Sequence, residues 1–98
     1  MSSNYVTRSE IIKKLSHQVQ VHNEQAAEAV KTIVNVMSHA LAKNRRIEIR
    51  GFGSFEVHEH KNKVVRNPKT GEVIPGATQY AIHFKPGKSL REQVLHLR

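Results

Sequence analysis

The residues of this chain best suited to binding chemistry lie in one basic turn, Arg66-Asn67-Pro68-Lys69-Thr70-Gly71. Asn-Pro and Thr-Gly pairs are typical of turns, and the fixed φ of proline suits an early turn position, where its missing N–H leaves no bond unmade. The run from residue 60 to residue 69 contains no carboxylate. Cations on such a turn repel one another, and an anion along it relieves that repulsion. The pattern predicts a protruding basic hairpin that binds a polyanion, with an ordinary solvated lysine-rich loop as the alternative.

The overall composition favours an anionic partner and limits the possible chemistry. The 98 residues carry a formal net charge of +8, from sixteen Lys and Arg against eight acids, all glutamate. There is no cysteine, which excludes disulfides, thiolate nucleophiles and zinc–thiolate sites. Residues 1–16 lack the apolar core of a signal peptide, and no apolar run is long enough to cross a bilayer. We therefore expect one soluble, cytoplasmic domain covering residues 1–98, without a membrane partner.

Catalytic and metal chemistry are poorly supported by the residue types. Glu56, His58 and His60 alternate along one expected strand, but no second cluster completes a coordination shell. Phosphoryl transfer usually needs paired carboxylates that hold metal ions, and the chain has no aspartate. The Gly51-Phe52-Gly53 segment joins two strands, whereas a phosphate loop leads from a strand into a helix. The prediction is a protein without a catalytic site, metal, cofactor or small-molecule substrate.

The first half of the chain has the apolar periodicity of two helices. Thr7 and Glu10 have capping-box spacing at the start of the first helix. A polar connection is expected around residues 17–22, with Asn23 capping the second helix. That helix should end near Asn44 and carries a wide apolar face, formed by Ala26, Ala27, Val30, Ile33, Val34, Met37 and Leu41.

The second half changes to the alternating pattern of strands. Apolar and polar residues alternate on both sides of the glycine-flanked turn at residues 51–53, which predicts a strand pair. Tyr80, Ile82 and Phe84 alternate in the same way, and Pro86-Gly87 ends this third strand. A last helix is expected from about Lys88, with its apolar residues inward, namely Leu90, Val94 and Leu97.

These elements predict an α+β domain with a helix-helix body, a three-stranded antiparallel sheet, a protruding β-hairpin arm at about residues 60–78 and a C-terminal helix. An arm in solvent contributes little to a core, and the remaining body is close to the size at which a monomer is marginal. The broad apolar face of the second helix exceeds what the other elements can cover. We expect an obligate dimer with one shared core; a monomer whose arm folds back is the alternative.

Three motifs together resemble the bacterial HU/IHF family of DNA-binding proteins. They are residues 46–55 (RIEIRGFGSF), residues 66–71 (RNPKTG) and residues 83–88 (HFKPGK), in the order and spacing of the family. Glu48 and Arg50 favour its integration host factor branch. The resemblance implies two intertwined subunits, identical or related, whose arms lie in the minor groove of double-stranded DNA and bend it. It also implies an architectural role in the nucleoid, in transcription regulation and in recombination.

The resemblance also implies roles for individual residues. Pro68 is the expected wedge, because a rigid apolar residue without a donor can enter between base pairs. Phosphate and groove contacts are assigned to the arm, the first strand and the start of the last helix. The expected DNA-binding residues are Arg46, Arg50, Lys61, Lys63, Arg66, Asn67, Pro68, Lys69, Lys85 and Lys88. Because a bend costs about 1 to 10 kcal/mol depending on sequence, easily deformed sites are expected to be preferred.

The arm departs from the family pattern at three positions. His60, Lys63 and Val65 stand where arginines and a glycine are usual, which predicts weaker arm contacts, because a lysine lacks the planar fork of arginine. His58, His60 and His83, if they lie near phosphates, predict a DNA affinity that rises as pH falls through about 6.5. Binding of RNA or other polyanions by a basic dimer without bending is the alternative function, and it predicts indifference to Pro68.

Overall fold

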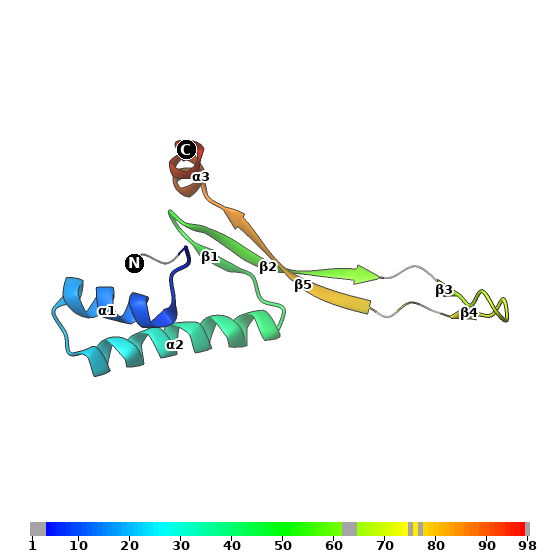
Figure 1. Cartoon of the computed structure of the whole chain (residues 1–98), viewed down its shortest axis with the longest axis horizontal. Helices are drawn as coiled ribbons and strands as arrows, with labels where there is room; N and C mark the ends of the chain where they lie inside the picture. Colours follow the sequence, from blue (N-terminus) through cyan, green and yellow to red (C-terminus); the bar gives the residue numbers. More distant parts are fainter. Residues whose placement is uncertain (1–3, 62–64, 75, 77, 98) are drawn as a thin grey trace. The chain divides into compact units, whose positions relative to one another are not determined.

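The computed structural model describes residues 4–61, 65–74, 76 and 78–97. The chain divides into two compact units, Met1–His39 and Ala40–Arg98. Along the chain, as Figure 1 shows, the elements are α1 (Arg8–Val19), α2 (Asn23–Ala42), β1 (Ile47–Ile49), β2 (Gly53–Lys61), β3 (Val65–Arg66), β4 (Val73–Ile74), β5 (Thr78–Pro86) and α3 (Lys88–Leu95). This is the predicted α+β order of two helices, two strands, an arm, a strand and a helix.

Helix α1 begins as its sequence predicts and ends later. The Thr7 hydroxyl accepts a hydrogen bond from the backbone N–H of Glu10, which satisfies one of the unpaired donors of the first turn. The helix continues to Val19, so the expectation of a connection from residue 17 was wrong at its start. Gln20 adopts a left-handed conformation (φ 57°) and its N–H donates to the Ser16 carbonyl, which ends the helix.

The start of α2 differs by one residue from the prediction. Asn23 is the first residue of the helix and not its cap. The backbone N–H of His22 donates to the side-chain oxygen of Gln25 at 3.3 Å, and the His22 carbonyl accepts from the N–H of Ala26. His22 therefore occupies the cap position, with a glutamine three residues later in the reciprocal role of a capping box.

The end of α2 is set by Asn44, near the predicted place. Asn44 adopts a left-handed conformation (φ 59°), and its N–H donates to the Leu41 carbonyl. The N–H of Arg45 donates to the Ala40 carbonyl at 2.9 Å. These two bonds form a Schellman motif, for which asparagine is suited because it tolerates the left-handed region.

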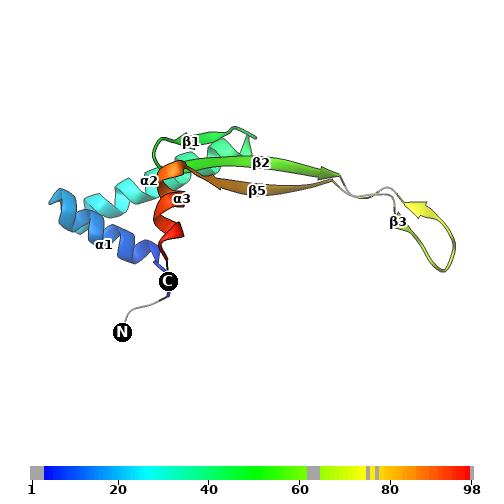
Figure 2. The ribbon, with the colours of Figure 1, turned by 90° about the horizontal axis from the view of Figure 1, so that it is seen from above.

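A three-stranded antiparallel sheet with the order β1-β2-β5 forms the centre of the second unit, and β2 and β5 run side by side over their length (Figure 2). Phe55 pairs with Phe84 across β2 and β5, and Ile47 of β1 pairs with Phe55 on the other side. Because side chains alternate along a strand, these residues share one apolar face of the sheet. The rings of Phe52, Phe55 and Phe84 pack at centroid distances of 4.7 to 6.5 Å.

Few apolar side chains are buried within a single chain. Among the described residues, Ala26 and Val30 of α2 are the only buried hydrophobic ones. Of the three apolar residues expected to point inward near the C-terminus, Leu90 is half-buried, and Val94 and Leu97 are 54% and 75% exposed in the single chain. Further large apolar side chains are exposed on α2 and β5, namely Ile33, Val34, Val36, Tyr80 and Ile82. This exposed area is what a second subunit would cover.

Candidate nucleic-acid interface

The face of the three-stranded sheet opposite the phenylalanines is polar and charged. The strand register places Glu56 opposite His83 and Ser54 opposite Lys85, and Glu48 of β1 pairs with Ser54. His58 and His60 follow on the same face of β2, because every second residue points to the same side. We name this surface the polar sheet face; its residues are Arg46, Glu48, Ser54, Glu56, His58, His60, His83 and Lys85.

Arg46 lies between two carboxylates on the polar sheet face. Its Nε is 3.3 Å from Oε1 of Glu56, and its Nη2 is 3.9 Å from Oε2 of Glu48. The side chain remains 57% exposed, so both ion pairs compete with water and with any anion that approaches. The sequence assigned Arg46 to DNA contact, and the structure shows that this cation is already paired in the free chain.

Glu56 also contacts a pair of histidines. Oε2 of Glu56 accepts a hydrogen bond from Nε2 of His58 at 3.2 Å, and the His58 ring stacks on the His83 ring with centroids 4.9 Å apart and planes 20° apart. The hydrogen bond from His58 is the main cause that lowers the pKa of the Glu56 carboxyl below its ordinary value, and the positive charge of Arg46 lowers it further against the effect of partial burial. Glu56 therefore remains ionised at neutral pH.

A basic pocket of about 440 Å³ lies where the turn after β1 meets the start of α3. Its charged lining consists of five cations and one acid, and α3 begins there at Lys88 without a side-chain cap on Gly87. First-turn N–H groups and nearby cations together suit a phosphate. The residues of this pocket are Arg46, Glu48, Ile49, Arg50, Gly51, Gly53, Ser54, Lys85, Pro86, Gly87, Lys88 and Arg91.

Four predicted residues meet in the basic pocket, and one further cation was missed. Arg50, Lys85 and Lys88 line it together with Arg46, although they come from separate segments of the chain. Arg91 lines it as well and was not predicted. The signal was present in the sequence, since residues three apart on a helix share a face and Arg91 follows Lys88 at that spacing.

The predicted arm has at its end a small hairpin in which β3 and β4 pair. The turn between them is closed by the Asn67 N–H, which donates to the Glu72 carbonyl at 2.8 Å, and by the Gly71 N–H, which donates to the Asn67 carbonyl at 2.7 Å. Oδ1 of Asn67 accepts from the N–H of Lys69 at 2.9 Å, across Pro68. Gly71 has φ +73°, which favours glycine. Pro68 is thereby held exposed within a hydrogen-bonded turn.

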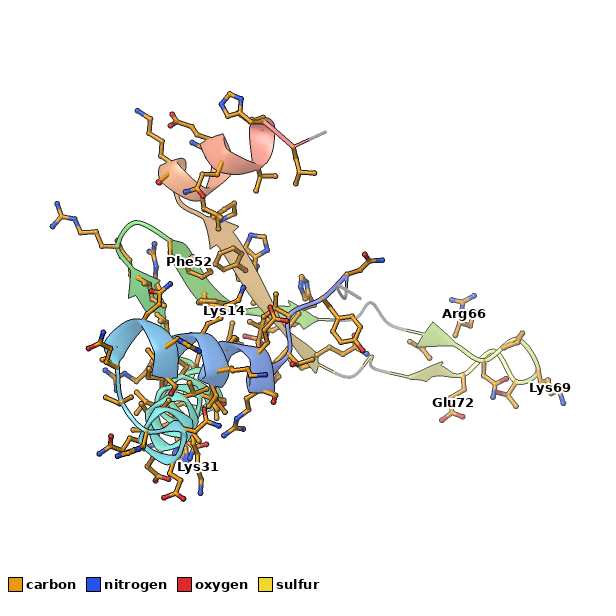
Figure 3. The ribbon with its side chains drawn as sticks, turned by 60° about the vertical axis from the view of Figure 1, so that its left-hand side comes forward. Lys14, Lys31, Phe52, Arg66, Lys69 and Glu72 are labelled. Carbon is orange, nitrogen blue, oxygen red and sulfur yellow. The ribbon has the colours of Figure 1, made fainter. Side chains whose placement is uncertain are left out.

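The charged side chains of this hairpin point in different directions, as Figure 3 shows. Arg66 and Glu72 project from opposite edges of the hairpin, and Lys69 lies at its tip. Lys61 is exposed at the end of β2, where it pairs with Thr78 of β5. Lys63, the remaining predicted DNA-binding residue, lies outside the described residues. Along the chain, Arg66 and Lys69 stand on either side of the exposed Pro68.

The described part of the chain contains no candidate metal site. There, no group of three or more histidine, cysteine or acidic side chains could hold a metal ion, and the Glu56–His58–His83 cluster is no exception. None of the helices described here is long and apolar enough to span a membrane.

Comparison with protein families gives one match that covers most of the chain. A family described as bacterial DNA-binding protein matches residues 6–95. The beta subunit of integration host factor from Colwellia psychrerythraea is 46% identical over 90 residues, which cover 91% of this chain and 95% of that protein. The corresponding subunit from Pseudomonas aeruginosa is 48% identical over 90 residues, covering 91% of this chain and 96% of that protein.

Solved structures show the same architecture. An Anabaena HU–DNA cocrystal structure has a TM-score of 0.76 at 27% identity, over 93% of this chain and 99% of that one. HU from Thermotoga maritima has a TM-score of 0.63 at 26% identity, over 91% of this chain and 98% of that one. The predicted HU-like α+β fold is therefore confirmed.

Proposed function

The chain belongs to the bacterial DNA-binding protein family that includes HU and integration host factor, and on that premise we propose that it bends double-stranded DNA with Pro68 as the intercalating wedge. It is an architectural DNA-binding protein that acts on duplex DNA as a dimer. The family match over residues 6–95 supports one domain that includes both compact units. The partner subunit is a second copy of this chain or a related chain. The apolar side chains exposed on this chain, such as Ile33 and Ile82, would pack against the partner in the shared core.

The turn at Pro68 is the observation that carries the bending mechanism. The backbone and side chain of Asn67 bond to three residues of the turn, so the proline ring is presented on a preformed support. Entry of an apolar ring between base pairs costs a few kcal/mol per step in lost stacking, and a support that is already ordered adds no further ordering cost. Arg66 and Lys69 stand on either side of Pro68 in the sequence and would hold the phosphates or groove edges beside it.

The remaining predicted DNA contacts belong to two places, the part of the arm next to β2 and the basic pocket. We propose that Lys61 and Lys63 follow the DNA along the arm, and that Arg46, Arg50, Lys85 and Lys88 bind phosphates from the body. Arg91 joins this group because it lines the same pocket. Charge supplies affinity in this scheme and the wedge supplies the kink, so sequence preference would come mainly from the deformability of the site.

No chemical step is assigned to the protein. We propose that it acts by binding alone, without catalysis, cofactor or metal, because the relatives are DNA-binding proteins and because the cations of the pocket suit phosphate binding. Its place of action would be the bacterial nucleoid in the cytoplasm, in DNA organisation, transcription regulation and recombination.

The Pro68→Ala variant tests the wedge. Fluorescence transfer between dyes on the two ends of a duplex measures the bend, and fluorescence anisotropy measures the affinity. We expect Pro68→Ala to bind within about threefold of the unmodified protein and to bend the duplex less, because the phosphate contacts remain and the wedge is removed. Val73→Ala, an exposed apolar change in the same hairpin, is the control. An unchanged bend in Pro68→Ala would refute the assignment, and equal affinity for RNA and DNA duplexes would favour the polyanion-binding alternative.

A further inference from the structure

Three titratable groups on the polar sheet face form one connected cluster. Glu56 bonds to His58 at 3.2 Å, and His58 stacks on His83, which is the cross-strand partner of Glu56. The cluster thus joins β2 to β5. Its carboxylate also holds Arg46, whose Nε is 3.3 Å from Oε1 of Glu56. A change of charge on the two imidazoles is therefore transmitted directly to a cation that is assigned to phosphate binding.

When both imidazoles are neutral, the carboxylates beside the cluster offset the positive charge of Arg46. Arg46 is paired with two carboxylates, Glu56 of β2 and Glu48 of β1, so these three side chains have a net charge of −1. The pKa of Glu56 is lowered, so this carboxylate stays charged while imidazoles change charge between about pH 5 and 8. The other titratable groups on this face are its neighbours along the strands: His60, two residues from His58 on β2, and the cation Lys85, two residues from His83 on β5.

We propose that the Glu56–His58–His83 cluster couples DNA binding to the uptake of a proton. This inference rests on the proposed function and adds a titrating element to its interface. With a proton on the histidine pair, the imidazolium neutralises Glu56, and Arg46 is released from this carboxylate for a phosphate. A phosphate on this face in turn favours the protonated pair, because binding and protonation are linked.

In this scheme Glu56 weakens phosphate binding when the histidines are neutral. At high pH the carboxylate holds Arg46 and repels the DNA, and at low pH the protonated histidines cancel that effect. The affinity should therefore increase on acidification by up to about tenfold per pH unit for each proton taken up, over the range in which the pair titrates. This specifies the broader expectation for His58, His60 and His83: the pH dependence should come from the stacked pair and not from His60.

Three variants separate the effect of the Glu56–His58–His83 cluster on DNA affinity from the effect of histidine charge elsewhere in the protein. His58→Gln can still donate a hydrogen bond but cannot take up a proton, so its DNA affinity should remain near the high-pH value and vary less with pH. Glu56→Gln should bind about three- to tenfold more tightly than the unmodified protein at pH 8, and its advantage should shrink toward pH 6. His17→Gln, on α1 and outside the polar sheet face, should keep the full pH profile.

Two measurements test these expectations. Anisotropy titrations of one duplex between pH 5.5 and 8.5 at constant ionic strength give the pH profile of affinity, and circular dichroism verifies that each variant is folded. Calorimetry at pH 6.5 in buffers with different heats of ionisation gives the protons taken up on binding. Proton uptake that falls in His58→Gln, together with tighter binding by Glu56→Gln at pH 8, supports the proposal.

The proposal and the proposed function fail in different ways. A protein that binds and bends DNA, but whose pH profile and proton uptake are unchanged in His58→Gln, would overturn the proton coupling alone. Weaker binding by Glu56→Gln at pH 8 would also overturn it, because Glu56 would then position Arg46 for DNA and not restrain it. Absence of duplex binding at every pH would instead refute the proposed function.

Discussion

Gly53 lies so close to the Lys85 carbonyl that a Cβ on Gly53 would be 2.5 Å from that oxygen and 2.8 Å from two ring atoms of Phe84. Since Gly53 pairs with Pro86 in the sheet, this close approach fixes the end of the β2–β5 pair beside the basic pocket. We expect Gly53→Ala to lower the free energy of unfolding by about 1–3 kcal/mol, because an added methyl group must displace packed backbone and an aromatic ring. Urea unfolding at a fixed protein concentration measures the change.

Gly51 is the control for Gly53, because Gly51 is constrained by its backbone conformation and not by crowding. A Cβ there would meet no atom within 4 Å, but Gly51 has φ +86°, so alanine is strained by its backbone conformation alone. Asparagine tolerates that conformation better, and Gly51→Asn should therefore be less damaging than Gly51→Ala. At Gly53 the order should reverse, because asparagine is the larger side chain. If asparagine were better tolerated than alanine at Gly53, crowding would not be its constraint.

The arm tip should contribute a measurable share of the salt dependence of binding. Replacement of Arg66 and Lys69 by alanine should make the slope of log affinity against log salt less steep by about 0.9 for each phosphate that these two cations neutralise. The slope is measured by anisotropy titrations at several salt concentrations. Lys13→Ala with Lys31→Ala removes two charges from the helices and is the matched control. Equal slopes in the unmodified protein and the arm variant would place the phosphate-binding cations elsewhere.

Local features of the fold could be read from the sequence, because each is set by a few neighbouring residues. Thr7 caps α1, Asn44 ends α2, and the Asn67-Pro68 turn forms as its residue types predict. The end of α1 was misplaced because a left-handed Gln20 is not a strong sequence signal. His22 was missed as a cap because the bond to its N–H comes from the side chain of Gln25.

Features that depend on strand register could not be read from the sequence. Glu56 and His58 were placed on one face of a strand by alternation, but the position of His83 beside them follows from pairing across β2 and β5. The pairing of Arg46 with Glu56 likewise joins residues ten apart, one just before β1 and the other on β2. A one-residue shift of either strand would have moved these groups to the other face, and composition alone does not fix the shift.

Arg91 should contribute to affinity as much as the predicted cations beside it. It lines the basic pocket together with Lys88 at the start of α3, and both side chains are exposed. We expect Arg91→Ala to weaken duplex binding by about threefold to thirtyfold, with a less steep salt slope and an unchanged bend, because one fewer cation faces the phosphates while the wedge remains. Arg8→Ala on α1 is the control. An affinity equal to that of the unmodified protein would exclude Arg91 from the interface.

Glu56 should also shape the acid stability of the protein. The hydrogen bond from His58 and the charge of Arg46 lower its pKa in the folded state from the ordinary value of 4.5, so the folded state binds a proton less readily than the unfolded state. This contribution to stability is fully present above the unfolded pKa and is lost as pH falls through the lowered folded pKa. In urea unfolding between pH 3 and 7, Glu56→Gln should therefore lose less stability below about pH 4.5 than the unmodified protein does. Glu59→Gln, on the opposite face of β2, corrects for the change in net charge. If the free energy of unfolding fell equally with acidification in Glu56→Gln and in the unmodified protein, the ion pairs of Glu56 would not stabilise the folded state.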